Sequence, residues 1–156
     1  MKGAFVLLLL PDMAAKLLGI SVRQVKGFCR EGLLPAVRLP SDQFGIPRMY
    51  LLALKAFLQG RHATEHAMRS FANSKDGKFH ISQAKRRLRD AIAEAASASA
   101  DRPFLKILEA SRATGLPEFN LRKWMTCKGP PNSPRLVDPE ELVATVCIWE
   151  DKPPTA

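Results

Sequence analysis

Residues 22–30 place polar and charged side chains where they can recognise a nucleic acid. Arg23, Gln24, Lys26 and Arg30 fall on one side of a helix of period 3.6. Arginine and glutamine can each form paired hydrogen bonds with base edges, to guanine and adenine respectively, while cations further along a helix meet phosphates. The other side of the helix is apolar and is formed by Val22, Val25, Phe28 and Cys29. We expect Arg23 and Gln24 to read bases and Lys26 and Arg30 to contact phosphates; the alternative is a basic, solvated helix face.

The preceding residues predict the elements that hold this helix in place. Asp12 is expected to cap a helix over residues 12–18, whose apolar positions include Met13, Leu17 and Leu18. Gly19 suits the left-handed residue that ends such a helix. Ser21 and Gln24 have the spacing of a capping box, in which the two residues cap the next helix reciprocally.

A short ribbon and a third helix are expected to follow. Residues 36–39 and 44–46 are strand candidates around a turn, and Pro47 can start a helix. The apolar stripe of that helix consists of Tyr50, Leu51, Leu54, Phe57 and Leu58. Residues 4–10 resemble a short signal peptide, but they end at Pro11 without a clear cleavage site, so we interpret them as a buried edge strand. The order helix, turn, helix, hairpin, helix is the plan of a winged helix-turn-helix unit.

Three segments also carry a family resemblance. They read Ala14-Ala-Lys-Leu-Leu-Gly-Ile-Ser21, Glu31-Gly-Leu-Leu-Pro35 and Ile46-Pro47 followed by an apolar helix. In this order they resemble the MerR/excisionase-like winged helix-turn-helix domains, over about residues 10–58.

The resemblance implies that Arg23, Gln24 and Lys26 face a major groove. It also implies that the wing lies near a minor groove, with contacts from Arg38 and Arg48. We add Lys16 and Ser21 to the expected DNA-binding residues. Wings of the family often carry Arg or Lys before the Ile-Pro pair, whereas this chain has Gly45 there, which predicts weaker wing contacts.

An altered second copy of this pattern follows nearer the C-terminus. Gly19 and Gly115 are 96 positions apart, and the same offset aligns Val25 with Leu121 and Phe28 with Trp124. It also pairs Ala14 with Ala110, Ile20 with Leu116, Gln24 with Asn120, and Lys26 with Arg122. A third helix would use Leu142, Val143, Val146 and Trp149. We infer two tandem winged units.

The copy differs at the positions that would bind DNA. Pro117 replaces the capping Ser21, and Phe119 replaces Arg23 on the outward side. The remaining expected DNA contacts of this unit are Asn120, Arg122, Lys123, Lys128 and Arg135. Two interpretations stay open: both units contact DNA, or the second is a protein interface around Phe119. Burial of Phe119 against the linker is the third alternative.

The connection between the units is expected to be helical and basic. Residues 61–72 suit a helix, residues 73–77 a loop, and Ser82 can cap a helix that runs to about residue 96. Its apolar side would hold Ala84, Leu88, Ile92 and Ala95; the opposite side would hold Lys85, Arg86, Arg87 and Arg89. That cluster predicts phosphate contacts or, equally, a solvated face. Linker helices followed by a winged unit are also weakly similar to the C-terminal parts of TniQ-type transposition proteins.

Net charge supports a polyanionic partner. The chain of 156 residues has a net charge of +9. Residues 1–58 hold eight basic and three acidic residues (+5), residues 59–100 eight and four (+4), and residues 101–156 eight and eight (zero). We therefore expect the DNA-binding surface in the first two thirds of the chain. The three cysteines form no Cys-x-x-Cys pair, which favours free packing residues over disulfides or a zinc knuckle.

One motif points to different chemistry. His62-Ala-Thr-Glu65-His66 matches the His-x-x-Glu-His signature of zinc peptidases. A catalytic zinc needs a third protein ligand, for which Glu140 or Glu141 are candidates. The surrounding unit is too small for that enzyme class, so we interpret the pair as incidental and expect neither an enzyme nor a metal site.

The sequence thus predicts a mainly α fold with short β-hairpin wings, in which a helical linker joins tandem winged helix-turn-helix units. The expected boundaries are 1–60 for the first unit, 61–100 for the linker, 101–150 for the second unit and 151–156 for a tail. We expect a sequence-specific double-stranded DNA-binding protein, either a transcription regulator or an excisionase-like recombination factor of a mobile element. The alternative is a protein-interaction adaptor. Expected partners are DNA, a second copy, a recombinase or a transcription protein; no cofactor, no membrane and a cytoplasmic, nucleoid-associated location complete the expectation.

Overall fold

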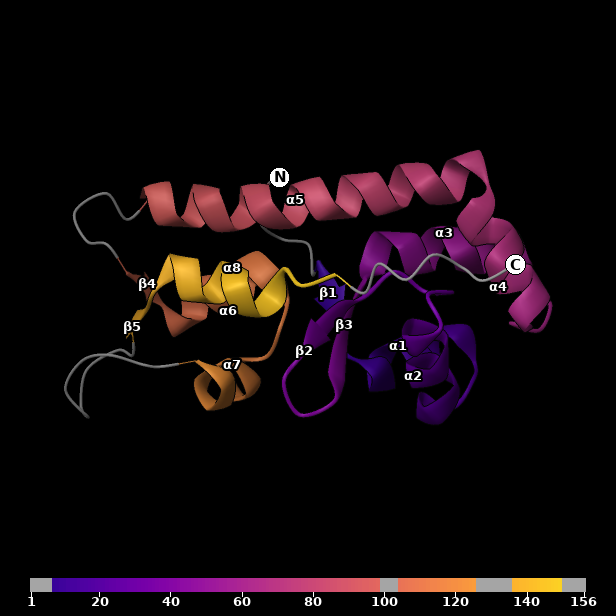
Figure 1. Cartoon of the computed structure of the whole chain (residues 1–156), viewed down its shortest axis with the longest axis horizontal. Coiled ribbons are helices and arrows are strands. Elements are labelled where there is room, and N and C mark those ends of the chain that lie inside the picture. Colours follow the sequence, from indigo (N-terminus) through magenta and orange to yellow (C-terminus); the bar gives the residue numbers. More distant parts are fainter. Residues whose placement is uncertain (1–6, 99–103, 126–135, 150–156) are drawn as a thin grey trace.

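The computed structural model describes residues 7–98, 104–125 and 136–149. These residues form a mainly helical protein, with eight helices and two small antiparallel sheets (Figure 1). The longest helix lies along one edge of the molecule, and the shorter elements pack beneath it in two groups. No helix within the described ranges combines the length and the apolar character needed to cross a lipid bilayer.

The first group contains three strands and three helices. They are β1 (Leu8–Leu9), α1 (Pro11–Leu18), α2 (Val22–Arg30), β2 (Val37–Leu39), β3 (Gln43–Pro47) and α3 (Arg48–Leu58). The antiparallel strands have the order β1-β3-β2, with Leu8 opposite Pro47 and Val37 opposite Gly45. The predicted edge strand is therefore confirmed for Leu8–Leu9, and residues 4–6 of that prediction lie outside the described residues.

Capping residues close to the ends of α1 and α2 determine where these helices start and stop, and one of the predicted caps is wrong. Gly19 ends α1 with φ of 71°, and Ser21 and Gln24 form the predicted capping box at the start of α2. The predicted cap at Asp12 is wrong, because the N-cap of α1 is Leu10 and Pro11 occupies the first turn. Proline suits that turn because it has no N–H to leave unpaired.

The connection departs from prediction at both of its helices. Helix α4 (Glu65–Asn73) begins four residues later than expected, because the Thr64 side chain accepts a hydrogen bond from the Ala67 N–H at 3.1 Å. The predicted loop at 73–77 is wrong: α5 (Lys75–Ala98) starts directly after Ser74. Ser82, the predicted cap, lies inside α5.

Ser74 and Gly77 make this sharp corner. The Ser74 hydroxyl accepts from the Gly77 N–H at 3.0 Å and donates to the Phe71 carbonyl at 2.6 Å. A Cβ atom placed on Gly77 would lie 2.0 Å from that same carbonyl oxygen. Residues that look like a flexible loop in the sequence are therefore a tight helix-helix corner that only glycine fits.

The second group repeats the order of elements seen in the first. It comprises β4 (Leu105–Lys106), α6 (Ile107–Thr114), α7 (Glu118–Trp124), β5 (Leu136–Val137) and α8 (Pro139–Val146). Strands β4 and β5 pair antiparallel, with Leu105 opposite Val137. Gly115 ends α6 with φ of 82°, as Gly19 ends α1. The predicted second wing falls on residues that lie outside the description.

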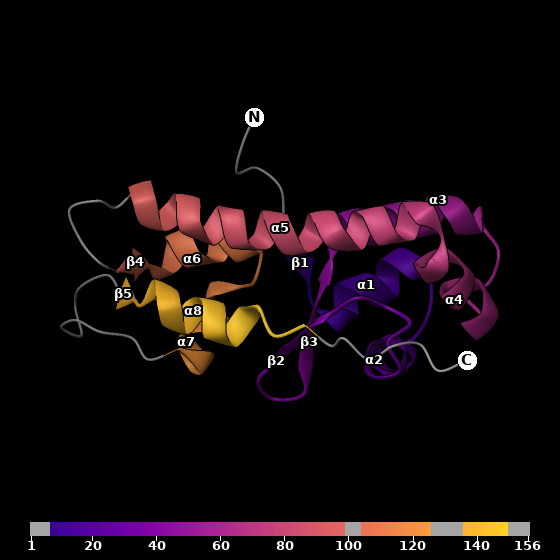
Figure 2. The same ribbon diagram turned by 45° about the horizontal axis from the view of Figure 1, so that its top comes forward.

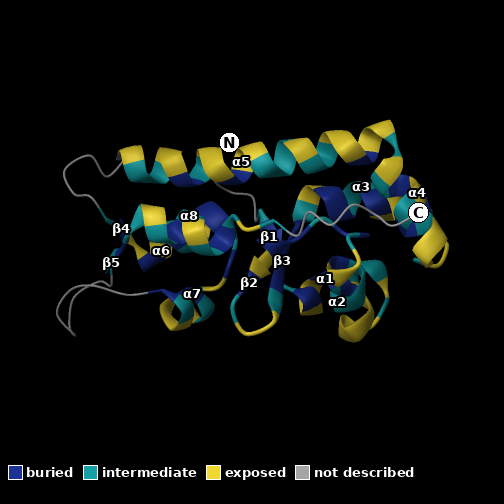
Figure 3. Cartoon of the chain, in the orientation of Figure 1, coloured by how far each residue is buried: buried dark blue, intermediate teal, exposed yellow. Residues whose placement is uncertain are grey.

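Two hydrophobic cores meet beneath α5. One core, around Tyr50, Leu54 and Phe71, belongs to the first group and α4. The other contains Leu88 and Ile92 of α5 and the buried residues of the second group, but it also includes Leu8, Val37 and Leu39 of the first sheet. Figure 3 shows the buried side of α5 facing both groups. The expected boundaries at 60 and 100 consequently do not separate independent cores.

The segment after α8 adds a further link between the groups. Trp149 was predicted to belong to the third helix of the second group. This prediction is wrong, because α8 ends at Val146. Trp149 instead forms an antiparallel bridge with Val37 of β2, and the Arg38 N–H donates to the Ile148 carbonyl at 2.7 Å. The edge of the hairpin is thereby paired with the second group.

Candidate nucleic-acid interface

Helix α2 presents the predicted polar side to solvent. Arg23, Gln24 and Arg30 are exposed, whereas Val25 and Cys29 are fully buried against the first core. Lys26 is half-buried. Val22, expected on the apolar side, remains 40% exposed. The helix is therefore packed through one side and open on the side that carries Arg23.

The capping box limits what Gln24 can do. Its Oε1 atom accepts hydrogen bonds from the Ser21 N–H at 3.0 Å and the Ser21 hydroxyl at 3.2 Å. A paired contact with adenine needs this same oxygen as an acceptor. Because Gln24 Oε1 already accepts two hydrogen bonds from Ser21, a contact with adenine would require these bonds to break, and Arg23 is the better placed of the two to read a base.

An ion pair connects α2 to the hairpin turn. Arg30 Nη2 lies 2.8 Å from Asp42 Oδ2, and both side chains are at least half exposed. Ser41 and Asp42 adopt left-handed φ values of 63° and 58° at this turn. An exposed pair of this kind contributes up to about 1 kcal/mol. Arg30 was predicted as a phosphate contact, but its charge is partly neutralised by Asp42.

The hairpin differs from the expected wing in its distribution of charge. Arg38 is exposed on β2, as predicted. Gly45 is buried, and a Cβ atom there would lie 3.0 Å from Leu8 Cδ1, so any larger side chain at this position would require Leu8 to shift. Arg48 follows β3 at the end away from the turn, and its N–H donates to the Leu7 carbonyl at 2.9 Å. Arg48 therefore does not belong to the tip of the wing.

Helix α7 is built like α2 but carries a different outward side. Leu121, equivalent to Val25, is fully buried, and Phe119, equivalent to Arg23, is 77% exposed. Burial of Phe119 against the linker is therefore ruled out. Arg122 and Lys123 are exposed and Asn120 is half-buried. Lys128 and Arg135 lie outside the described residues.

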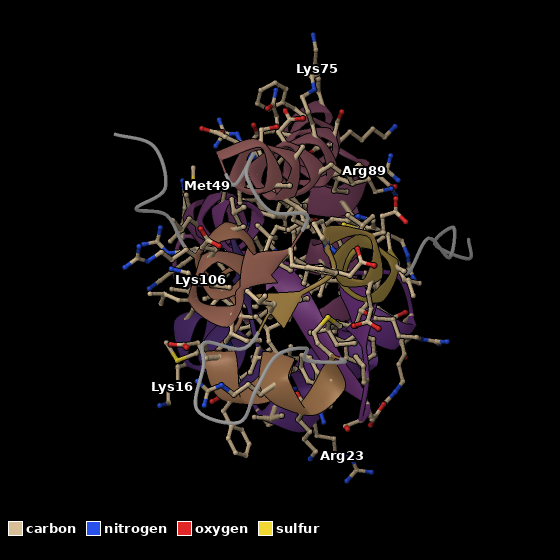
Figure 4. All side chains as sticks on the ribbon, turned by 90° about the vertical axis from the view of Figure 1, so that its left-hand side faces the viewer. Lys16, Arg23, Met49, Lys75, Arg89 and Lys106 are labelled. Atoms are coloured by element: carbon tan, nitrogen blue, oxygen red, sulfur yellow. The ribbon has the colours of Figure 1, made fainter. Side chains whose placement is uncertain are left out.

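These elements share one edge of the molecule. In Figures 1 and 2, α2 and α7 lie on either side of the β2–β3 hairpin, along the edge opposite α5. Figure 4 shows Arg23 and Lys16 in the lower part of the view and Arg89, a predicted DNA-binding residue of α5, in the upper part. The residues predicted to bind DNA are consequently divided between two edges.

The basic cluster of α5 is itself divided. Lys85 Nζ lies 5.7 Å from the centre of the Trp149 ring, on the side of α8. Arg89 is on the same side, where its charge lowers the pKa of the Cys147 thiol while burial, the larger effect, raises it. Arg87 lines a cavity with Met49 and Phe79 on another side of the helix. The predicted single basic face is therefore wrong, because packing of α5 on both groups spreads these side chains around it.

The histidine pair does not have the geometry of the zinc signature. His62 lies outside α4, which begins at Glu65, so the helical turn that should join His62 to His66 is not formed. Glu65 instead accepts from Arg69 at 2.9 Å. Glu140 and Glu141 lie on α8 in the other group. Across the described ranges, no three metal-binding side chains gather at one point.

Two residues, Arg112 and Asp42, had no role in the sequence prediction, and Trp149 was predicted only as part of a helix. Arg112 is exposed on α6 and occupies the position of Lys16 at the 96-residue offset, a signal that was present in the sequence. Asp42 and Trp149 carry no comparable signal, because their contacts with Arg30 and Val37 join residues that are distant along the chain.

Comparisons with known proteins leave the function to be argued from this geometry. No protein-family model matches the chain, and neither does any curated protein or any solved structure. The resemblance to MerR/excisionase-like domains therefore rests on the residues quoted for it.

Proposed function

We propose that the chain is a sequence-specific double-stranded DNA-binding protein that inserts α2 into a major groove. In role it would be a transcription regulator or an excisionase-like accessory factor in recombination. The main support is the outward side of α2, where Arg23 is exposed beside the hairpin while Val25 and Cys29 anchor the opposite side in the core. A groove-binding helix needs this division between a fixed side and an open side.

Charge around α2 suits a duplex. Lys16, Arg23 and Arg38 are exposed on the edge formed by α1, α2 and the hairpin. Only Asp42, paired with Arg30, brings an acidic group to the hairpin turn itself. Phosphate neutralisation by these cations would supply most of the affinity, and Arg23 would supply base preference.

A second candidate function is a protein-interaction adaptor. It is favoured by Phe119, whose 77% exposure is unusual for a phenylalanine, and by the zero net charge of residues 101–156. The two functions differ in what Arg23 contributes. An adaptor that binds through α7 does not depend on Arg23.

Selection of duplexes from a randomised library, followed by mobility-shift assays with competitor DNA, tests the first function. We expect one enriched sequence and competitor-resistant binding. Arg23→Ala should weaken binding to that sequence about 5- to 150-fold and relax one or two base positions. Lys75→Ala, which removes one exposed cation from α5, is the control and should leave base preference unchanged. Uniform weak binding that is lost at moderate salt, or an Arg23→Ala variant with unchanged preference, would contradict the proposal.

A further inference from the structure

We infer that α7 extends the DNA contact beyond the hairpin on the same duplex, so that the protein recognises a composite site of fixed spacing. This inference rests on the proposed function of α2. It assigns a role to Phe119, Arg122 and Lys123, which form the outward side of α7.

The first support is placement. Helices α2 and α7 lie on the same edge, with the β2–β3 hairpin between them (Figures 1 and 2). A duplex that lies along this edge meets α2, then the hairpin, then α7. Lys75, at the start of α5, lies at the end of the view away from Arg23 in Figure 4, so it does not compete for this duplex.

The second support is a set of contacts that fix the two groups relative to each other. Val37 of the hairpin is bridged to Trp149, and the Arg38 N–H donates to the Ile148 carbonyl at 2.7 Å. Val37 and Leu39 are also buried in the core of the second group. Separation of α7 from the hairpin would break these hydrogen bonds and expose this core. The distance between the two helices is therefore set by the fold, unlike that between domains on a flexible tether.

The third support is chemistry. Arg122 and Lys123 are exposed cations, and Arg112 on α6 adds another. Among the described residues, the ion-pair partner of Arg122 is Glu118, whose Oε1 lies 3.9 Å from its Nη2. Phe119 takes the place of Arg23, and an exposed aromatic ring can pack on the methyl group of thymine. The α7 part of the site should consequently prefer A·T pairs and depend on phosphates.

The test uses the full chain and the duplex selected by the wild type. Hydroxyl-radical footprints are compared for wild type, Phe119→Ala, the double variant Arg122→Ala/Lys123→Ala, and the control Lys75→Ala/Lys78→Ala. The control removes the same charge from exposed positions of α5. Circular dichroism checks that each variant is folded.

We expect the Arg122/Lys123 double variant to lose protection on one flank only and to reduce the salt dependence of log K by about two. Phe119→Ala should remove the A·T preference of that flank. Inserting five base pairs between the DNA segment bound by α2 and the segment bound by α7 rotates one segment to the far side of the duplex. This insertion should weaken wild-type binding to the level of the Arg122/Lys123 double variant.

The outcomes separate this inference from the proposed function. One outcome is that the wild type selects a DNA sequence that Arg23→Ala alters, while the α7 variants and the insertion leave binding unchanged. In that case α7 does not contact DNA, so this inference is wrong and the proposed function of α2 stands. The same holds if the α5 control reduces binding as much as the α7 variant. If the wild type selects no DNA sequence, both the proposed function and this inference are wrong.

Discussion

The first and second groups of elements can be compared at positions that are 96 residues apart. Positions that face inward agree: Val25 and Leu121 are fully buried, and Gly19 and Gly115 both have left-handed φ values. Positions that face outward differ, since Arg23 is replaced by Phe119. Packing therefore constrains one side of each helix, while the open side is free to acquire different recognition chemistry.

The turns of the two groups are also stabilised differently. In the first, the N–H groups of Gly19 and Ile20 both donate to the Ala15 carbonyl. In the second, Thr114 Oγ1 donates to the Ala110 carbonyl at 2.9 Å and accepts from the Leu116 N–H at 3.2 Å. Both turns share a hydrogen bond from the glycine N–H to the carbonyl four residues before it, and the second turn adds a buried side-chain hydroxyl.

The largest expected effect tests whether the two groups fold together. Leu88 of α5 is 1% exposed, and Leu88→Ala should lower the free energy of unfolding by about 2–5 kcal/mol through lost burial and a cavity. Chemical denaturation is followed by far-ultraviolet circular dichroism and by fluorescence of Trp124 and Trp149, which both lie in the second group. We expect the two signals to move together, because α5 packs on both groups.

Leu108→Ala is the matched control, since Leu108 is 45% exposed and the same atoms are removed. Leu108→Ala should lower the free energy of unfolding by well under half of the loss expected for Leu88→Ala. A first transition seen by fluorescence alone would show that the groups unfold independently.

An intermediate effect distinguishes the two turns. Thr114→Val keeps the shape of the side chain but removes the hydroxyl, which leaves the buried Leu116 N–H without its partner. We expect a loss of about 1–3 kcal/mol in the free energy of unfolding, measured by urea denaturation. Thr114→Ser retains the hydroxyl and loses only a methyl group. An equal or larger loss in the serine variant would mean that packing, and not the hydrogen bond, stabilises this turn.

The smallest expected effect concerns the start of α2. Ser21→Ala removes the capping hydrogen bond to the Gln24 N–H and should cost about 1 kcal/mol. Ser82→Ala, inside α5, removes an exposed serine that caps nothing and should cost nothing. Thermal denaturation of both variants checks this difference. Equal melting temperatures for the two variants would contradict the capping assignment.

Local signals explain why the first group could be predicted well from sequence. Ser21 with Gln24 and the left-handed Gly19 each act within a few residues, and they set the start of α2 and the end of α1 respectively. The start of α5 was missed because Ser74 and Gly77 are common in loops, and their role in the corner depends on the Phe71 carbonyl.

The candidate site was predicted only in part, because its geometry depends on tertiary packing. Helical periodicity placed Arg23 outward, but it could not show that Gln24 Oε1 is held by Ser21. The charge count could not show that Arg23 lies on the edge away from α5, or that the cations of α5 are spread around that helix. That separation follows from how α5 packs across both groups.

The central claim is that the edge formed by α2 and the hairpin meets DNA, while the outer edge of α5 does not. Titration of the isotopically labelled protein with its selected duplex, followed by amide chemical shifts, tests this most directly. We predict that the amides of Arg23, Gln24 and Arg38 shift strongly, while those of Lys75 and Lys78 stay in place. Shifts concentrated on α5, with Arg23 and Gln24 unmoved, would contradict the account.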